Sequence, residues 1–153
     1  MKIFSFILFF ILSMMSGYAE NTVKVLFSPD NNVTFSAYEV GGLLKYKISY
    51  KGKPVILESQ LGIDGWSRNL EIERIDSSSV HKTWHPVYGE RAVVEDCYKE
   101  YNYTLKIKGR GSRLALIVRA YNSGIGFRYK YLGSSYLRIS KEETTFVVPE
   151  NTY

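Results

Sequence analysis

Apolar and polar residues alternate along much of the chain after its first twenty residues. Apolar side chains occupy every second position in 44–50, 101–107 and 127–131. In a β-strand, side chains two positions apart point to the same side of the sheet. Each segment therefore predicts a strand with one buried and one solvated face, as in antiparallel sheets. No stretch after the first twenty residues shows a convincing helical period.

Residues that favour turns separate these segments, at 41–42, 51–54, 109–111 and 122–124. Residues 114–118 are apolar at every position, which favours a central strand. Further strands are expected at 22–27, 33–38, 55–57, 70–75, 80–84, 91–94 and 144–148. Many short strands with close turns predict an all-β fold, and we expect an antiparallel β-sandwich.

The first residues, MKIFSFILFFILSMMSGYAE, follow a different pattern. Lys2 gives a positive start, residues 3–15 are almost wholly apolar, and small residues stand at Gly17 and Ala19. This is typical of a secretory signal peptide, with cleavage expected after Ala19. The apolar run is short for a membrane anchor, which is the alternative. We expect a signal peptide at 1–19, a mature domain at 20–153, no membrane contact after cleavage, and a periplasmic or secreted location.

Charge and cysteine content narrow the functional classes. The net charge is +5, without basic blocks, and loss of Lys2 with the signal peptide lowers it by one. Together with export, this argues against nucleic-acid binding. Cys97 is the only cysteine, so no internal disulfide is possible. We expect an idle or buried thiol rather than a nucleophile, because no histidine is signalled as its partner.

The stretch TWHPVYGER, residues 83–91, holds the densest group of reactive side chains. His81, His85 and Glu90 have a spacing that would suit a zinc site on a helix. However, Pro86 and Gly89 disfavour a helix. In a strand the two histidines would lie about 13 Å apart at roughly 3.3 Å per residue, so we expect no metal site there.

The acidic residues of the same region are candidates for glycoside hydrolysis or calcium binding. Glu95 and Asp96 are adjacent in sequence, so a strand would point them to opposite faces. We expect a solvated rim, or ion pairs with Arg91 and Lys99, and no catalytic residue. The acidic residues in question are Glu90, Glu95, Asp96 and Glu100.

Aromatic residues are abundant, with 13 Tyr, 2 Trp and 8 Phe. Such rings stack on sugar faces, but they also favour strands and protein cores. Both interpretations stay open for Trp66, Trp84, Tyr88, Tyr98 and Tyr101.

Six short motifs follow one another in an order that resembles the N-terminal domain of glycoside hydrolase family 97. They are Ser-Pro-Asp at 28–30, Gly-Lys-Pro at 52–54, Ser-Gln-Leu-Gly at 59–62, Trp-His-Pro-Val-Tyr-Gly-Glu at 84–90, Arg-Ala-Tyr at 119–121 and Gly-Phe-Arg-Tyr at 126–129. No single motif is specific, but six in this order and spacing are.

The resemblance implies a β-sandwich that is part of a larger super-sandwich, followed in the full-length enzyme by a (β/α)₈ barrel. Members of the family are exported, calcium-dependent exo-acting α-glucosidases or α-galactosidases with catalytic carboxylates in the barrel. We expect residues 20–153 to be a partial N-terminal domain that is not catalytic alone, and no catalytic or metal-binding residue is carried over to it. Calcium is expected for the full-length enzyme, with the barrel as partner and an oligosaccharide as a possible ligand.

The resemblance also bears on residues 84–91, which are interpreted as a strand–turn–strand corner with Pro86 and Gly89 in the bend. Its candidate contacts with the barrel or with carbohydrate are Trp84, Tyr88, Glu90 and Arg91. Two alternatives remain: a free-standing secreted carbohydrate-binding module, and a small metalloenzyme that uses His81, His85 and Glu90. A sandwich that lacks strands would leave unpaired edges that favour association.

Overall fold

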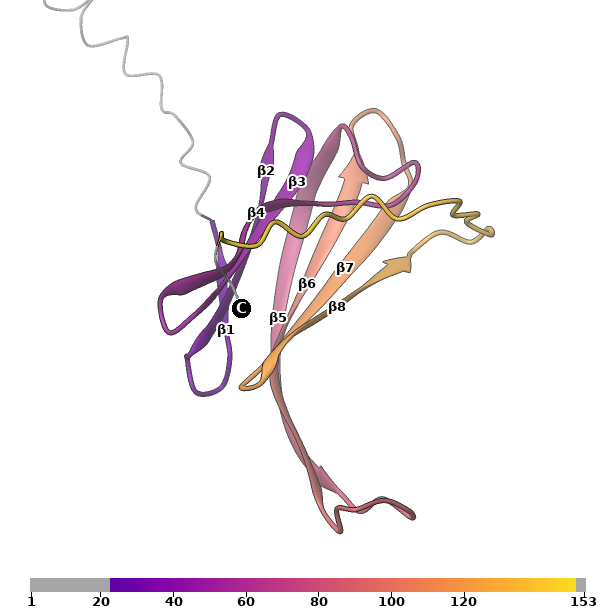
Figure 1. The fold of residues 1–153 in the computed structure, drawn as a ribbon. Helices are drawn as coiled ribbons and strands as arrows, with labels where there is room; N and C mark the ends of the chain where they lie inside the picture. The colour runs from indigo at the N-terminus through magenta and orange to yellow at the C-terminus, as the bar shows by residue number, and fades with distance from the viewer. Residues whose placement is uncertain (1–22, 151–153) are drawn as a thin grey trace, which may run out of the picture.

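The computed structural model describes residues 23–150, where the chain forms two antiparallel four-stranded sheets (Figure 1). The first sheet has the order β1 (Val25–Phe27), β2 (Val33–Val40), β3 (Leu43–Tyr50) and β4 (Lys53–Leu61). The second has the order β5 (Leu70–Trp84), β6 (Val94–Ile107), β7 (Arg113–Tyr121) and β8 (Gly124–Tyr131). The sheets pack face to face, which confirms the predicted antiparallel β-sandwich. The predicted signal peptide lies outside the described residues, which include no helix long and apolar enough to cross a membrane.

The alternating positions of the two sheets meet in a single core. Phe35 of β2 stacks on Tyr46 of β3 with ring centroids 5.9 Å apart. The same Phe35 ring contacts Tyr103 of β6, in the opposite sheet, with centroids 6.4 Å apart. All three rings are fully buried. Because a buried side chain of this size stabilises the fold by roughly 1.5–3 kcal/mol, these contacts fix how the sheets face each other.

β7 is the central strand that its apolar sequence predicts. It lies between β6 and β8, and residues 114–118 are buried on both faces. The predicted strands at 101–107 and 127–131 are also confirmed, although β6 begins earlier, at Val94.

Three strand predictions need correction. The separate strands expected at 70–75 and 80–84 are one long strand, β5, because the polar residues between them pair with β6 in unbroken register after a bulge near Glu73. The strand expected at 91–94 is wrong, since residues 85–93 form a loop before β6. The strand expected at 144–148 is not regular, although its backbone follows β4.

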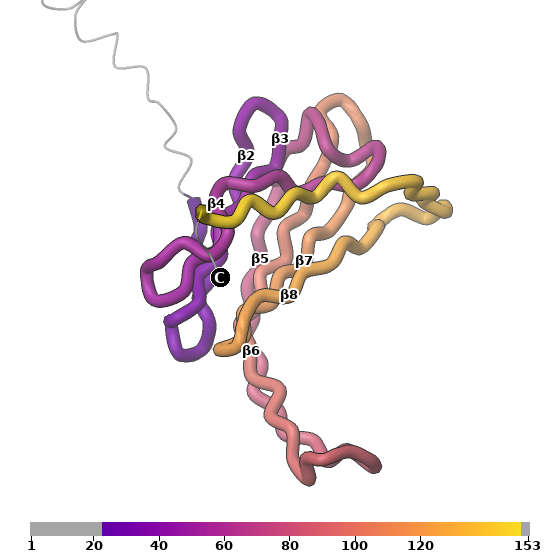
Figure 2. The backbone as a smooth tube through the Cα atoms, in the orientation of Figure 1, coloured from indigo at the N-terminus to yellow at the C-terminus, as the bar shows by residue number. Residues whose placement is uncertain are grey.

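This last segment, residues 141–148, is called the strap here (Figure 2). It runs antiparallel to β4, with main-chain bonds of 2.8–2.9 Å from Leu57 N to Val147 O, from Thr145 N to Gln60 O and from Glu143 N to Gly62 O. Between them, side-chain hydroxyls replace carbonyls as acceptors, for Gln60 N at Thr145 Oγ1 and for Val147 N at Ser59 Oγ. This substitution explains why the strap covers the β4 edge without forming a regular ladder.

Residues 62–69 carry the chain from the first sheet to the second. Ile63 forms a bridge with Trp66, whose side chain is buried in the core. At Gly62 a Cβ atom would lie only 2.9 Å from Ser67 Cβ. The glycine of the Ser-Gln-Leu-Gly motif therefore permits a close approach that a larger residue would disrupt.

Candidate functional site

The outer halves of β5 and β6 leave the sandwich as a two-stranded ribbon (Figure 1). β6 pairs with β7 only from Lys99 to Lys106, whereas its pairing with β5 continues to the Trp84–Val94 pair. Residues 80–98 are called the arm here. Each of its strands has only the other as a neighbour within residues 23–150, and an isolated two-stranded hairpin is marginally stable in water. The arm is therefore the part of the described structure that depends most on additional contacts.

The two faces of the arm differ in chemistry. Facing residues of β5 and β6 share a side of the ribbon, and successive pairs alternate between the two sides. One side carries the pairs Val80–Tyr98, Lys82–Asp96 and Trp84–Val94, and the other carries His81–Cys97 and Thr83–Glu95. The first side is mostly apolar with one oppositely charged pair, and the second is polar.

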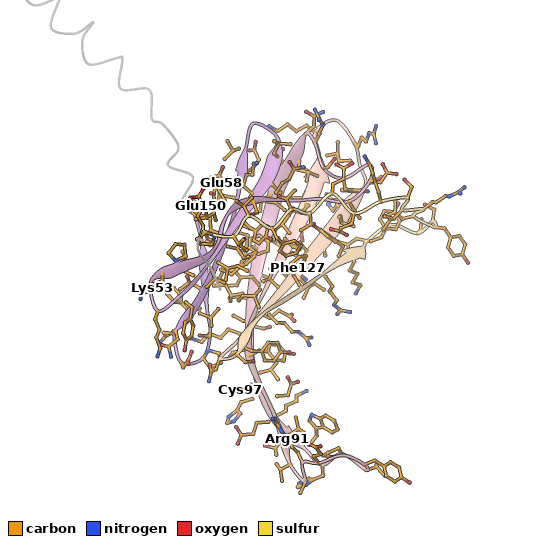
Figure 3. All side chains as sticks on the ribbon, viewed as in Figure 1. Lys53, Glu58, Arg91, Cys97, Phe127 and Glu150 are labelled. Atoms are coloured by element: carbon orange, nitrogen blue, oxygen red, sulfur yellow. The ribbon has the colours of Figure 1, made fainter. Side chains whose placement is uncertain are left out.

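The tip of the arm holds the four residues singled out from the sequence. Residues 85–93 form a loop that is closed by a 3.0 Å hydrogen bond between His85 Nδ1 and the carbonyl oxygen of Ala92. Gly89 has φ 134°, a conformation that favours glycine. This geometry agrees with the predicted strand–turn–strand corner. Figure 3 places Arg91 near the end of the arm, with Cys97 closer to the sandwich.

The side chains at the tip are exposed. Tyr88 and Val87 are 91% and 86% accessible, and Trp84 is 52% accessible. Glu90 and Arg91 are also exposed, and neither forms an ion pair with another residue in 23–150. The tip of the arm thus presents the Tyr88 ring, the Trp84 indole and two opposite charges that its own fold does not use.

The base of the arm is locked to the second sheet by Arg119 of β7. Its Nε donates a 2.7 Å hydrogen bond to Glu100 Oε2, which raises the pKa of the guanidinium. The Arg119 Cζ atom lies 4.3 Å from the centroid of the Tyr98 ring, a cation–π contact. Tyr98 in turn contacts Tyr121, with ring centroids 5.2 Å apart. Arg119, Glu100, Tyr98 and Tyr121 therefore form one cluster that joins the arm to the sandwich.

The expected ion pairs of the acidic region are accordingly wrong for Glu100, which pairs with Arg119 rather than with Arg91 or Lys99. Lys99 Nζ instead donates to Asn31 Oδ1 over 3.3 Å, in the β1–β2 turn. The sequence did not signal the Glu100–Arg119 pair, because their proximity depends on the register of β6 and β7.

The Ser-Pro-Asp motif braces that β1–β2 turn. Ser28 Oγ and Asn32 N donate to Asp30 Oδ1 over 2.5 and 3.1 Å. These bonds, the Ser28 bond above all, lower the pKa of Asp30. Asp30 N donates to Asn122 Oδ1 over 3.0 Å, which ties the turn to the β7–β8 turn. This motif has a structural role at the junction of the two sheets.

Only part of the predicted aromatic surface is available to a ligand. Trp66 and Tyr98 are buried, at 4% and 7% exposure, so the sugar-contact interpretation is wrong for both. Tyr101 is half-buried and its hydroxyl donates to the Val25 carbonyl over 3.1 Å, between the two sheets. Trp84 and Tyr88 are the two rings of the five that remain exposed.

The residues considered for metal binding or as a nucleophile are His81, His85, Glu90 and Cys97. Residues 23–150 contain no group of three or more His, Cys, Asp or Glu side chains that could hold a metal ion. His81 stands directly opposite Cys97 in the register of β5 and β6, a pairing that the sequence did not reveal, and Cys97 is a free, half-buried cysteine.

Comparison with known proteins agrees with this architecture. A family model described as Glycosyl-hydrolase 97 N-terminal matches residues 26–153. Two structures of a glycoside hydrolase family 97 enzyme from Pseudoalteromonas sp. strain K8, in complex with panose and with acarbose, are 29% identical to this chain. They superpose with TM-scores of 0.75 and 0.76 over 83% of its length. A β-arabinopyranosidase, 21% identical with a TM-score of 0.74, shares the fold.

The chain spans only about 20% of the length of the two Pseudoalteromonas structures and 21% of the arabinopyranosidase. In each case the matched portion is a β-sandwich within a much larger protein.

Proposed function

Because this chain belongs to the glycosyl-hydrolase 97 N-terminal family, we propose that it supports the catalytic (β/α)₈ barrel of an exported α-glycosidase and contacts that barrel through its arm. The family match over residues 26–153 is the observation that supports the proposal. The exposed tip residues Trp84, Tyr88, Glu90 and Arg91 supply the contacts, and an oligosaccharide in the neighbouring substrate pocket is a second ligand within their reach.

The arm has the properties of a surface made for burial. Aromatic residues and arginine are enriched in protein–protein interfaces. A charged side chain that loses its water in an interface must pair with an opposite charge on the partner, which makes the contact specific. Tyr88 and Trp84 leave much of their area in water, while Glu90 and Arg91 have no partner among residues 23–150. Contact with a barrel would bury the apolar side of the ribbon and stabilise a hairpin that is marginal alone.

Catalysis belongs to the barrel in this proposal. Hydrolysis of a glycoside needs two carboxyl groups on either side of the scissile bond. The acidic residues of the arm are distributed over both faces of a ribbon, and Glu100 is engaged with Arg119. Calcium binds six to eight oxygen ligands, and residues 23–150 hold no group of three or more His, Cys, Asp or Glu side chains that could bind a metal ion. In this proposal most ligands of the calcium ion of the full-length enzyme lie in the barrel.

An activity assay tests this division of roles. The purified chain is incubated with nitrophenyl α-glucoside and nitrophenyl α-galactoside in the presence of calcium. We expect no turnover above the buffer blank. Turnover that persists after repeated purification, and that is lost in a Glu95→Gln or Asp96→Asn variant, would overturn the proposal.

Contact through the arm is tested by fluorescence of Trp84. The Trp66→Phe variant leaves Trp84 as the single tryptophan of the mature chain. Adding a separately produced family 97 barrel should shift its emission to shorter wavelength, because the indole leaves water. A Tyr88→Ala change should weaken the shift, whereas Thr83→Ala, on the polar side of the arm, serves as the matched control.

A free-standing carbohydrate-binding module is the second candidate, and the exposed Trp84 and Tyr88 rings are the observation that favours it. Calorimetry with maltose and galactose oligomers separates the two. Heat that disappears in Trp84→Ala would favour the module, whereas no heat with any oligomer would leave the barrel-support role.

A further inference from the structure

Strand β8 is the outer strand of the second sheet and has no strand on its far side within residues 23–150. It pairs with β7 along its whole length, from Gly124 opposite Tyr121 to Tyr131 opposite Leu114. The strap does not fill the open position, because it follows β4 in the other layer (Figure 2). Such an unpaired edge is a template for an additional strand.

The hydrogen-bond pattern shows which main-chain groups of β8 face the free edge. Leu132 N donates to Arg113 O over 3.1 Å, and these two residues continue the β7–β8 register. Bonded positions alternate in an antiparallel pair, so the even-numbered residues of β8 bond to β7. The odd-numbered residues therefore direct their N–H and C=O groups away from β7. They are Ile125, Phe127, Tyr129 and Tyr131.

The side chains of these odd-numbered residues form an apolar surface that the sandwich covers only in part. Phe127 and Tyr129 pack against the core, yet both are half-buried rather than buried. Phe146 of the strap stacks on Phe127, with ring centroids 6.5 Å apart, and is itself 62% exposed. Aromatic area is therefore exposed beside the free main-chain groups, and a further strand would cover it.

The even-numbered residues of β8 carry positive charge without a counter-charge. Arg128 and Lys130 are exposed, and neither forms an ion pair with another residue in 23–150. Four acidic side chains of β5 and β6 already have basic partners in the second sheet. Their pairs are Asp76–Arg74, Glu71–Lys106, Glu73–Arg113 and Glu100–Arg119. The charge of β8 is thus available to an acidic partner.

These two charges also decide between possible occupants of the edge. If two copies of β8 paired with each other, Arg128 and Lys130 of both copies would lie on one face of the joined sheet. Like charges on neighbouring strands destabilise the pair, and charged side chains on edge strands commonly prevent self-association. An acidic strand would instead gain from the same charges. The edge therefore favours an acidic strand over a second copy.

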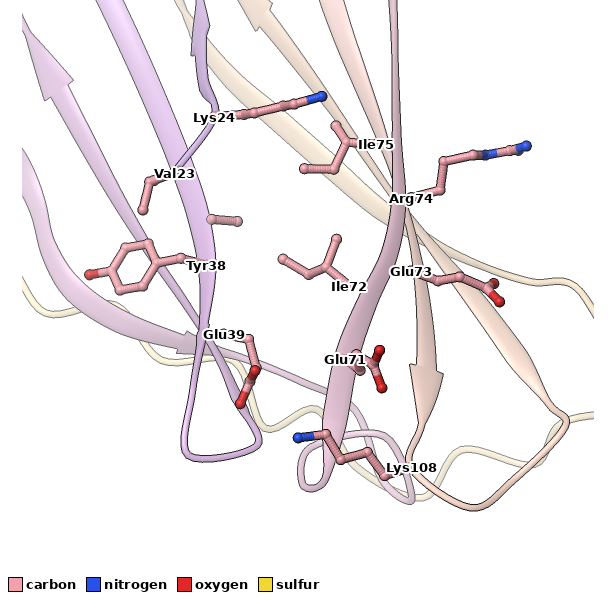
Figure 4. Close-up of a pocket in the computed structure, with 11 residues that line it drawn as sticks. Val23, Lys24, Tyr38, Glu39, Glu71, Ile72, Glu73, Arg74, Ile75 and Lys108 are labelled. Atoms are coloured by element: carbon pink, nitrogen blue, oxygen red, sulfur yellow. The ribbon is translucent and has the colours of Figure 1, made fainter. Parts of the chain in front are cut away.

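The groove on the β5 side of the sandwich lacks this preference (Figure 4). It has a volume of about 650 Å³ and lies between β2 and β5. Its charged lining residues are three acids and three bases, namely Glu39, Glu71, Glu73, Lys24, Arg74 and Lys108. Because these charges balance, the groove does not specify the charge of a partner, whereas the β8 edge does.

We propose that the free edge of β8 binds an extended segment of a partner polypeptide in which apolar and acidic side chains alternate. The main chain of that segment bonds to the odd-numbered residues of β8. Its apolar side chains cover Phe127 and Phe146, and its carboxylates pair with Arg128 and Lys130. The proposal does not depend on contact between the arm and a barrel, because β8 and the tip of the arm are separate (Figure 1).

Peptide titration of the mature chain tests the charge preference of the edge. The probe is the synthetic peptide acetyl-Thr-Val-Glu-Val-Glu-Val-Thr-amide, and the control peptide has lysine in place of both glutamates. We expect the glutamate peptide to bind at least about tenfold more tightly at low salt, since two ion pairs replace two repulsions. Equal affinities would overturn the proposal, as would no binding of either peptide at about 1 mM.

Charge reversal on β8 supplies the matched variants. Arg128→Glu combined with Lys130→Glu should reverse the preference, so that the lysine peptide binds about tenfold more tightly. Lys51→Glu combined with Lys53→Glu changes the net charge equally, but in the β3–β4 turn of the other sheet. This control should keep the preference for the glutamate peptide. The same reversal in both double variants would overturn the proposal, because net charge alone would then explain it.

Residue-resolved hydrogen exchange tests where the peptide binds. Without peptide, the amides of Phe127 and Tyr129 should exchange at least about tenfold faster than those of Arg128 and Lys130, which bond to β7. Saturating glutamate peptide should slow the first two about fivefold and leave the other two nearly unchanged. Protection of Phe127 and Tyr129 before peptide is added would assign the edge to a second copy and overturn the proposal. Equal slowing of all four amides would also overturn it.

Discussion

β5 and β6 pass through two different environments within single strands, and this contrast explains much of the molecule. In the sandwich, β6 has β7 as a second neighbour and the first sheet beneath it, and Tyr103 and Leu105 are buried. In the arm, the same strands have only each other. Regular pairing continues through both halves. Hydrogen bonds between two strands are therefore enough to shape the arm, while burial is what distinguishes its stability from that of the sandwich.

The largest expected difference in stability is between a substitution in the sandwich half of β6 and one in its arm half. Leu105→Ala removes a fully buried side chain and should lower the free energy of unfolding by about 2–5 kcal/mol. Val94→Ala, on the same strand in the arm, should lower it by less than about 1 kcal/mol. Urea denaturation of both variants measures the difference. Equal losses would mean that the arm unfolds with the core as one unit.

The next effect should appear at the junction. Arg119→Ala removes the ion pair with Glu100 and the cation–π contact with Tyr98, together worth about 1 kcal/mol at a partly exposed site. Hydrogen exchange should speed up about fivefold in residues 94–98, with little change in residues 102–106. Arg113→Ala, which loses an ion pair with Glu73 at the other end of β7, is the matched control. Exchange that rises equally along β6 would argue against a local lock.

A smaller effect is expected where the second sheet holds β1. Tyr101→Phe removes the hydrogen bond to the Val25 carbonyl and should lower the free energy of unfolding by about 0.5 kcal/mol. Thermal unfolding followed by circular dichroism measures this change. Tyr88→Phe, at the exposed tip, should leave the midpoint unchanged, and a comparable loss there would show that the tip is already packed in the isolated chain.

The smallest effect concerns pH at the turn beside the junction. Hydrogen bonds from Ser28 and Asn32 lower the pKa of Asp30 in the folded state. Its contribution to stability is therefore present above the unfolded pKa and is lost as the pH falls through the folded one. The melting temperatures of the parent chain and of Asp30→Asn should differ at pH 6 and converge as the pH falls well below 4. A constant difference across this range would assign the effect to something other than the charge.

The sandwich could be predicted largely from sequence because burial leaves a periodic signal. Alternation at 44–50, 101–107 and 127–131 identified strands whose apolar side chains pack in or against the core, with the exception of Tyr50, which is 44% exposed. The continuous apolar run at 114–118 identified the central strand. The strap was foreseen as extended chain, but its side-chain hydrogen bonds to β4 depend on tertiary contact that no local pattern records.

The arm could not be predicted in the same way, because no core imposes a period on it. The polar residues between 75 and 80 looked like a break, yet an edge strand in a ribbon accepts polar side chains on both faces. For the candidate site, exposure of Tyr88 and Trp84 agreed with the expectation, while burial of Trp66 and Tyr98 did not. The partners of Glu100 and Cys97 follow from strand register, which short-range sequence does not fix.

The passage from one sheet to the other through residues 62–69 has a consequence for biogenesis. Every strand of the first sheet precedes every strand of the second, so a chain that emerges N-terminus first can complete β1–β4 while β5 is still being synthesised. During that interval Phe35 and Tyr46 have no opposing layer. The half-built sandwich then exposes aromatic surface to water, and this exposure ends only when β6 brings Tyr103 and Leu105 into the core.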